Sequence, residues 1–333
     1  MKSSRKTEID VCRGICMMFV MLGHSIGVLK EPINWFILSF HMPAFYFISG
    51  VCLNLSTRKD TVLEGVCHKA RTTGYQYLVF SILGLFYYWT IRSRLGNNLH
   101  VTFNTSLFNI FVGKNIVPGF WFVYDLLIIT VLYIVIQNVR RRELYSFVLF
   151  FLLFVFFSYN VDETYYNGLA HRLTGGGTFY SVGAMLSQYI RDNKISLLFK
   201  QLSCQLWLLI AFSLSLGIVL IAFLNKPVVM AVNDYGNIWL FLSGAFLACI
   251  VLAIISEVIG KNKILEYIGV NSIIFLFIHF YILDFSHFLF NFLFVSGLNN
   301  SFPFYLLHFI VAILGSFGFA WIINKYIPFL IRI

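Results

Sequence analysis

The first apolar stretch of the chain, residues 9–29, contains an arginine and a histidine, residue types that a membrane-length helix seldom carries. Arg13 and His24 are eleven residues apart. Eleven steps of about 100° end roughly 20° past three full helical turns, so the two side chains share one face. Asp10 precedes Arg13 by three residues and lies on the same side. The spacing predicts a polar stripe along one helix.

The depth of each polar group suggests its chemistry. A helix rises about 1.5 Å per residue, which puts His24 about 16 Å above Arg13. With Arg13 near the inner edge of a hydrocarbon core of about 30 Å, His24 comes near mid-membrane. Ionisable groups at that depth face the helix bundle or a watery cavity. We expect a neutral His24 that accepts a proton as a general base. The alternative is a core histidine hydrogen-bonded to a neighbouring helix.

The composition is that of a membrane protein. Hydrophobic residues make up 59% of the 333 residues and charged residues 11%, and the mean hydropathy is +0.82. Many apolar runs reach the roughly 20 residues of a spanning helix, and they lack the alternation of a β-barrel strand. The net charge of +10 fits basic loops beside membrane helices better than a nucleic-acid-binding surface. We therefore expect an all-α polytopic integral membrane protein that lies in a lipid bilayer and binds no nucleic acid.

About ten transmembrane helices are predicted, at residues 12–30, 35–55, 74–91, 119–137, 145–159, 178–190, 204–224, 236–257, 265–285 and 303–324. With the N-terminus inside, 18 of the 24 Lys and Arg residues fall in inside segments and 6 in outside ones, which is a positive-inside bias. Both termini are then cytoplasmic. We expect an uncleaved first helix, because no small-residue cleavage site follows it. The longest outside loops are expected at 92–118 and 160–177, the second with a flexible Gly175-Gly176-Gly177.

Four segments resemble a known family. "IDVCRGICMMFVMLGHS" resembles the first-helix signature of the membrane acyltransferase-3 superfamily, an Arg or Lys followed by ten residues and a histidine. "FILSFHMPAFYFISGVCL" is similar to the second helix of its fucose 4-O-acetylase-like branch, which includes polysaccharide O-acetyltransferases. "FWFVYDLL" resembles the family's "LWFL" helix start, and "LEYIGVNSIIFLFIHF" resembles one of its late helices. The segments also follow the family's order along the chain.

The resemblance implies a single acyltransferase-3 transmembrane domain over residues 1–333, with no appended soluble domain. The implied location is the cytoplasmic (inner) membrane. It implies an O-acetyltransferase that moves an acetyl or other short acyl group from cytoplasmic acetyl-CoA. The acceptor is a hydroxyl of a carbohydrate, either a cell-surface polysaccharide or a lipid-linked oligosaccharide.

The resemblance also assigns roles to residues. His24 is the catalytic base, and an acyl-histidine route is the alternative. The CoA phosphates need basic groups at the inner face, so the acyl-CoA-binding residues are Arg13, Lys69 and Arg71, together with Asp10 beside Arg13. Asp10 either orients Arg13 or is a solvated charge at a helix start.

The sequence departs from the family pattern in two places. Where relatives carry R-x-x-R in the second inner loop, this chain has His68 and Arg71, with Lys69 as a substitute. Where relatives begin the third helix with "PYL", this chain has Gln76-Tyr77-Leu78, which lacks the proline that kinks a helix.

Four more side chains are candidates for the cavity or the acceptor site. His41, just before Met42-Pro43, either lines the cavity or bonds backbone that the proline frees. Asp125 lies in an apolar segment and needs a partner, as an acceptor-site residue or as half of a polar pair between helices. Trp121 lies in the same segment, and His279 is either a cavity residue or a structural one. The six cysteines form no CxxC pair, so we expect neither a disulfide nor a bound metal.

Other classes of function remain open. A transporter of glycan or acylated sugar would need broken helices at mid-membrane in paired positions and would work without CoA. A subunit of a glycan-export complex would tolerate loss of the polar residues inside the membrane. The polar stripe and the basic inner segment favour the acyltransferase.

Overall fold

The computed structural model describes residues 7–26, 31–55, 61–92, 102–160, 165–192, 194–293 and 301–331. Within these ranges the regular elements are helices, which confirms the all-α class. Residues 27–30 of the predicted first helix, and residues 93–101 and 161–164 of the predicted outside loops, lie outside the described residues. The chain divides into two compact units, Met1–Lys59 with Ile136–Ser272, and Asp60–Val135 with Ile273–Ile333.

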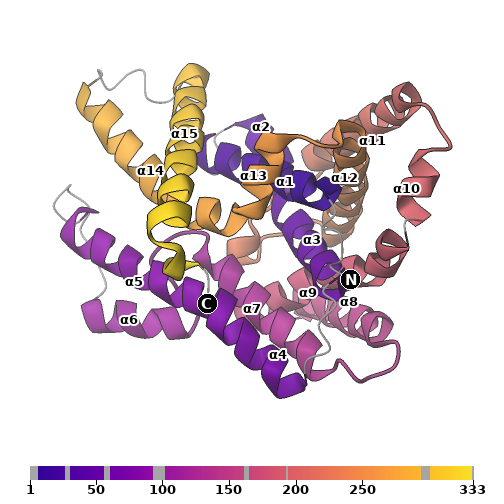
Figure 1. Ribbon diagram of the computed structural model, residues 1–333, viewed down its shortest axis with the longest axis horizontal. Coiled ribbons are helices and arrows are strands. Elements are labelled where there is room, and N and C mark those ends of the chain that lie inside the picture. The colour runs from indigo at the N-terminus through magenta and orange to yellow at the C-terminus, as the bar shows by residue number, and fades with distance from the viewer. Residues whose placement is uncertain are drawn as a thin grey trace. The chain divides into compact units, whose positions relative to one another are not determined.

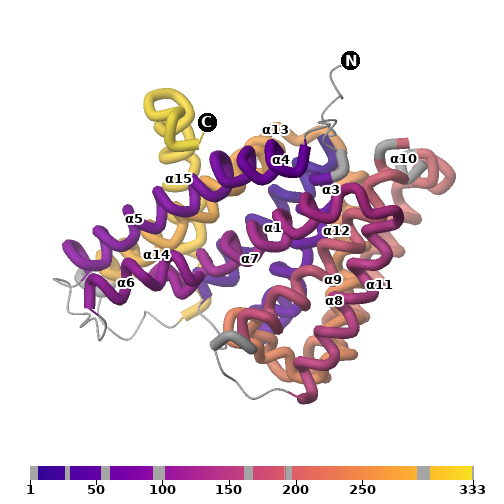
Figure 2. The backbone as a smooth tube through the Cα atoms, turned by 90° about the horizontal axis from the view of Figure 1, so that it is seen from below, coloured from indigo at the N-terminus to yellow at the C-terminus, as the bar shows by residue number. Residues whose placement is uncertain are grey.

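The first unit contains α1 (Thr7–Ile26), α2 (Pro32–Leu38), α3 (His41–Leu55), α8 (Arg142–Asn160), α9 (Tyr165–Arg191), α10 (Lys194–Phe199), α11 (Cys204–Leu224), η3 (Met230–Val232), α12 (Ile238–Ile259) and α13 (Lys263–Val270). Helix α1 packs on α13 and helix α3 on α9 (Figure 1). Helix α8 runs beside α9, and α11 beside α12 (Figure 2). Helices far apart in the sequence therefore form the core of this unit.

The second unit contains α4 (Val62–Lys69), the π-helix η1 (Ala70–Gly74), α5 (Tyr75–Thr90), α6 (Phe103–Phe111), α7 (Phe120–Val135), α14 (Ser272–Leu293), α15 (Phe302–Tyr326) and η4 (Pro328–Leu330). Helix α14 begins at the last residue of the first unit. Helices α4, η1 and α5 follow one another without a break, and α4 packs on α7.

Seven helical segments in the described residues are long and apolar enough to cross a membrane: Thr7–Ile26, Pro32–Leu53 (α2 with most of α3), Arg142–Asn160, Cys204–Leu224, Ile238–Ile259, Ser272–Phe290 and Phe302–Tyr326. These segments make the chain a multi-pass membrane protein. Helices α5, α7 and α9 match three further predicted ranges but fall outside this set. The count of ten and the cytoplasmic termini therefore stay predictions.

The interpretation of residues 160–177 as an outside loop is wrong, because helix α9 runs from Tyr165 to Arg191. Gly175, Gly176 and Gly177 are helical and buried. A Cβ on Gly176 would lie 2.7 Å from the Tyr46 ring of α3, and one on Gly177 would lie 2.6 Å from the Phe150 ring of α8. The three glycines make room for aromatic rings, and this packing outweighs their weak helix propensity.

Three other segments also differ from the prediction. The range 265–285 is divided, because α13 ends at Val270 and α14 begins at Ser272. Residues from Val62 onward, expected in an inner loop, already form α4 and η1. Helix α6 (Phe103–Phe111) lies within the predicted outside loop 92–118. These segments are short or contain polar residues, so their hydrophobic pattern is weak.

Reciprocal glycines bring two helix pairs of the first unit into backbone contact. In α3 and α9, a Cβ on Gly50 would collide with the carbonyl of Tyr180, and one on Gly183 would collide with the carbonyl of Phe47. Each helix thus gives a glycine to the backbone of the other. Small residues at such crossings let membrane helices approach closely. This close packing matters because the hydrophobic effect does not drive helices together in lipid.

Replacing Gly183 with alanine should lower the free energy of unfolding by about 1–3 kcal/mol, because the new Cβ must push α9 away from α3. Gly217→Ala in α11 is the matched control. No atom lies within 4 Å of its Cβ position, so this change should be neutral or slightly stabilising. Thermal unfolding of both variants in the same detergent would measure the difference. Equal melting temperatures would contradict a glycine-dependent crossing.

Candidate functional site

Arg13 of α1 reaches a serine from the late part of the chain. Its Nη2 donates a hydrogen bond to Ser272 Oγ at 3.0 Å. The Arg13 side chain is half-buried and Ser272 is buried. A serine oxygen is a neutral acceptor, so the bond orients the guanidinium and leaves its positive charge uncompensated by this contact. The remaining N–H groups of the fork suit a planar or phosphate-type anion.

Caps at both ends of α13 hold Ser272 in place. The Asn262 side chain accepts hydrogen bonds from the backbone N–H groups of Ile264 and Leu265, at 3.1 and 3.0 Å, which starts the helix. Asn271 ends it and donates from Nδ2 to the carbonyl of Tyr267 at 2.8 Å. The next residue is Ser272. Two asparagines in "NKILEYIGVNS" therefore set the short helix that presents the serine.

A second pair of reciprocal glycines fixes α1 against α13. A Cβ on Gly14 would collide with the carbonyl of Leu265, and one on Gly269 would collide with the carbonyl of Asp10. Gly14 follows Arg13 directly, and Gly269 precedes Ser272 by three residues. The first and last of the four family-like segments therefore meet at the Arg13–Ser272 bond. Asp10 is buried in this contact, and its role in orienting Arg13 stays a prediction.

His24 lies in the last turn of α1 and is half-buried. Helix α1 is continuous from Thr7 to Ile26, so Arg13 and His24 keep the spacing that puts them on one face. A Cβ on the preceding Gly23 would lie 3.2 Å from both Asn34 Oδ1 and the Ile37 side chain of α2. The end of α1 that carries His24 is thus packed on α2.

His41 begins α3, directly after the break that separates it from α2. Its Nδ1 lies 2.9 Å from the carbonyl oxygen of Ile37, and the ring is buried. A carbonyl only accepts, so Nδ1 carries the proton, and in the neutral ring Nε2 keeps the lone pair. Pro43 lies in the first turn of α3, where no intrahelical N–H bond is lost. The cavity role of His41 stays a prediction.

The two basic acyl-CoA candidates of the second unit follow each other along one helical segment. Lys69 is the last residue of α4 and Arg71 the second of the π-helix η1. Lys69 is half-buried and Arg71 is exposed. A π segment adds one residue to a turn, which redirects the side chains after it and is common at functional positions.

A capping box fixes the start of α4. Thr61 donates to Glu64 from its backbone N–H at 2.8 Å and from its hydroxyl at 2.9 Å. These two bonds lower the pKa of the Glu64 carboxyl. The box determines where the helix begins, and with it the positions at which Lys69 and Arg71 emerge.

The remaining candidates lie inside the second unit. Asp125 of α7 and His279 of α14 are fully buried, and Trp121 of α7 is half-buried. His279 Nδ1 donates to the carbonyl of Phe275 at 2.8 Å, and its ring packs on Phe280. His279 therefore has the same tautomer as His41, with the lone pair on Nε2. Acceptor-site roles for these three residues stay predictions.

Two groups of polar residues were not predicted from the sequence. Ser272 lies inside a family-like segment, but its contact with Arg13 joins positions 259 residues apart. Asp284 and Arg92 form an ion pair with two tyrosines nearby in the second unit. The signal for Asp284 was available, because it is an acid within a candidate membrane span.

The apolar helices indicate a multi-pass membrane protein, and buried polar side chains lie on several of them. A sequence model of the acyltransferase-3 family, described as an acyltransferase domain, matches residues 6–324. The chain therefore belongs to the acyltransferase-3 family. The match spans both structural units. No curated protein and no solved structure matches the chain.

Proposed function

We propose that the protein moves an acetyl or other short acyl group from cytoplasmic acyl-CoA to a hydroxyl of a cell-surface or lipid-linked glycan. The observation that carries this proposal is the Arg13–Ser272 hydrogen bond in a chain of an acyltransferase family. Arg13 lies on the same helix as His24. The second-helix segment around His41 favours the fucose 4-O-acetylase-like branch. Acetyl-CoA is the expected co-substrate, and the cytoplasmic membrane is the expected location.

The proposed donor site uses the basic groups at the inner ends of the helices. CoA carries phosphates on a long arm, and an arginine fork binds phosphate through two parallel hydrogen bonds. Arg13 is suited to this because Ser272 fixes its guanidinium through one nitrogen. The family resemblance also proposes Lys69 and Arg71 of the second unit as acyl-CoA-binding residues, and Arg71 is exposed.

The proposed chemistry has His24 as general base. The imidazole takes the proton of the acceptor hydroxyl, and the hydroxyl oxygen attacks the thioester carbonyl. The new C–O bond forms, the C–S bond breaks, and the imidazolium returns the proton to the departing CoA thiolate. The products are the glycan ester and free CoA. A route through an acyl-histidine would use the same residue as nucleophile.

The proposed topology places both termini in the cytoplasm and completes the count of ten with α5, α7 and α9. Helix α5 continues from α4 and η1, α7 has 16 residues, and α9 has 27. This assignment puts Lys69 and Arg71 on the cytoplasmic side, where acyl-CoA is found.

Mass spectrometry of surface and lipid-linked glycans from the wild-type and deletion strains tests the proposed function. Membranes of both strains are also incubated with acetyl-CoA labelled in the acetyl group. Loss of one acyl mass per sugar unit in the deletion strain, with loss of label transfer, supports the proposal. If the deletion strain makes less glycan and the remaining glycan is acylated as in the wild type, a transporter or export function replaces the proposed acyltransferase function.

A further inference from the structure

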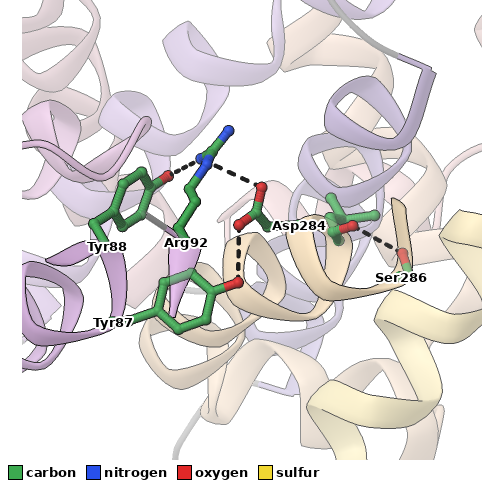
Figure 3. A network of polar contacts seen from close by, with 6 residues as sticks. Tyr87, Tyr88, Arg92, Asp284 and Ser286 are labelled. Carbon is green, nitrogen blue, oxygen red and sulfur yellow. Dashed lines mark hydrogen bonds and ion pairs between the residues drawn. The ribbon is translucent and has the colours of Figure 1, made fainter. Parts of the chain in front are cut away.

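A charged and aromatic cluster joins α5 to α14 in the second unit (Figure 3). Arg92 Nη1 lies 3.3 Å from Asp284 Oδ1 and also donates to the Tyr88 hydroxyl at 2.7 Å. The Tyr87 hydroxyl donates to Asp284 Oδ2 at 2.8 Å. The guanidinium lies over the Tyr88 ring, 4.7 Å from its centroid. These four residues are called the α5–α14 cluster.

The position of the cluster in the chain indicates a role beyond packing. Asp284 is the only acid in α14, and it lies in the candidate span Ser272–Phe290. A partly exposed ion pair contributes little stability, because solvent screens the charges and holding two long side chains in one geometry costs entropy. Ionisable groups in membrane segments usually line a cavity or a substrate path. A ligand explains the pair better than stability does.

The cluster has unused hydrogen-bonding capacity. The side chains of Arg92 and Asp284 are 28% and 21% exposed, so a ligand can reach both. In the part of the chain that the structure describes, Arg92 makes its polar contacts through Nη1. The N–H groups of Nη2 and Nε are left for another acceptor, and each Asp284 oxygen retains a lone pair for another donor.

This arrangement fits a neutral polyol. The two opposite charges sum to zero, so the carboxylate opposes an anion and the guanidinium opposes a cation. Of two neighbouring sugar hydroxyls, one can donate to Asp284 and the other can accept from Arg92. The half-buried ring of Tyr87 offers apolar surface for the C–H groups of a sugar ring.

We propose that the α5–α14 cluster binds a sugar unit of the acceptor glycan through its hydroxyls. This inference rests on the proposed function and adds the acceptor's binding site to it. In the proposed topology, α5 and α14 both run outward, and the cluster lies toward their outer ends. That is the side on which a cell-surface glycan is found.

Two kinds of variant test this assignment. Asp284→Asn removes the charge, and Tyr87→Phe removes one hydroxyl while keeping the ring. Tyr281→Phe is the matched control, because its hydroxyl donates to the backbone carbonyl of Phe80 and not to the cluster. The double variant Arg92→Asp/Asp284→Arg keeps an ion pair and reverses its direction. Membranes containing each variant receive labelled acetyl-CoA and increasing amounts of glycan purified from the deletion strain.

The expected result is a KM for glycan raised roughly ten- to hundredfold in Asp284→Asn, because a hydrogen bond to a charged group is lost. The KM for acetyl-CoA should stay within about twofold of wild type. Tyr87→Phe should shift only the glycan KM, and Tyr281→Phe should match wild type. The reversed pair should be present in the membrane at normal level and still bind glycan poorly.

An unchanged glycan KM in Asp284→Asn would overturn the inference about the acceptor site. The proposed function would still stand in that case, provided that wild-type membranes transfer label to the glycan. Wild-type activity in the reversed pair would show that the pair is structural only, which also overturns it. If wild-type membranes transfer no label to the glycan, the proposed function fails and the acceptor site fails with it.

Discussion

Replacing His24 with alanine should lower kcat for acyl transfer by roughly 10²- to 10⁴-fold, the usual contribution of a positioned general base. The loss should appear in kcat and not in the KM for acetyl-CoA, because the donor's phosphates are proposed to bind at Arg13, about 16 Å lower on the helix. Transfer of labelled acetyl groups by membranes with equal amounts of each protein measures both constants.

The matched variant is His24→Gln, which keeps a side chain that hydrogen-bonds but cannot take a proton at neutral pH. It should be as inactive as His24→Ala. If glutamine restores activity to within about tenfold of wild type, then His24 positions the substrate and another group is the base. Unreduced activity in both variants would remove His24 from the reaction altogether.

The second large effect is expected at Arg13. Arg13→Met should raise the KM for acyl-CoA by roughly ten- to hundredfold, because charge-assisted hydrogen bonds to phosphate are lost. Arg13→Lys should recover only part of the loss, since an ammonium keeps the charge without the planar fork. Ser272→Ala should give a smaller rise, because the guanidinium keeps its charge and loses only the bond that orients it.

Lys226→Met is the control for net charge. It removes one positive charge from the connection between α11 and α12, which the proposed topology places outside. Its KM for acyl-CoA should equal that of wild type. If Lys226→Met and Arg13→Met raise this KM equally, the effect is one of overall charge and Arg13 holds no phosphate. Titration of acyl-CoA at saturating glycan makes the comparison.

Strong apolar runs made several helices predictable to within a few residues. The predicted range 204–224 coincides with α11, and 236–257 differs from α12 by two residues at each end. Both helices are long runs dominated by apolar residues, so burial in lipid largely decides their extent. The shared face of Arg13 and His24 was equally predictable, because it depends only on helical geometry.

The errors arose where tertiary packing overrides local preference. Gly175 to Gly177 suggested a loop, but aromatic rings of α3 and α8 occupy the space above them and α9 continues through. Asn271 divides a run that looked like one helix, because its side chain caps α13. The bond from Arg13 to Ser272 could not be predicted, because sequence spacing gives no information about contacts between residues 259 positions apart.

The glycine crossing of α1 and α13 constrains how the protein can move. Gly14 and Gly269 each lie against a carbonyl of the other helix, so sliding or turning either helix would drive a side chain into that backbone. At both glycines the nearest atoms of the other helix are backbone, which cannot rotate aside as a flexible side chain would. Helices α1 and α13 must therefore move together as a rigid body, and Arg13 and His24 keep a constant distance from Ser272. Any opening to load a donor or release a product must hinge elsewhere in the chain.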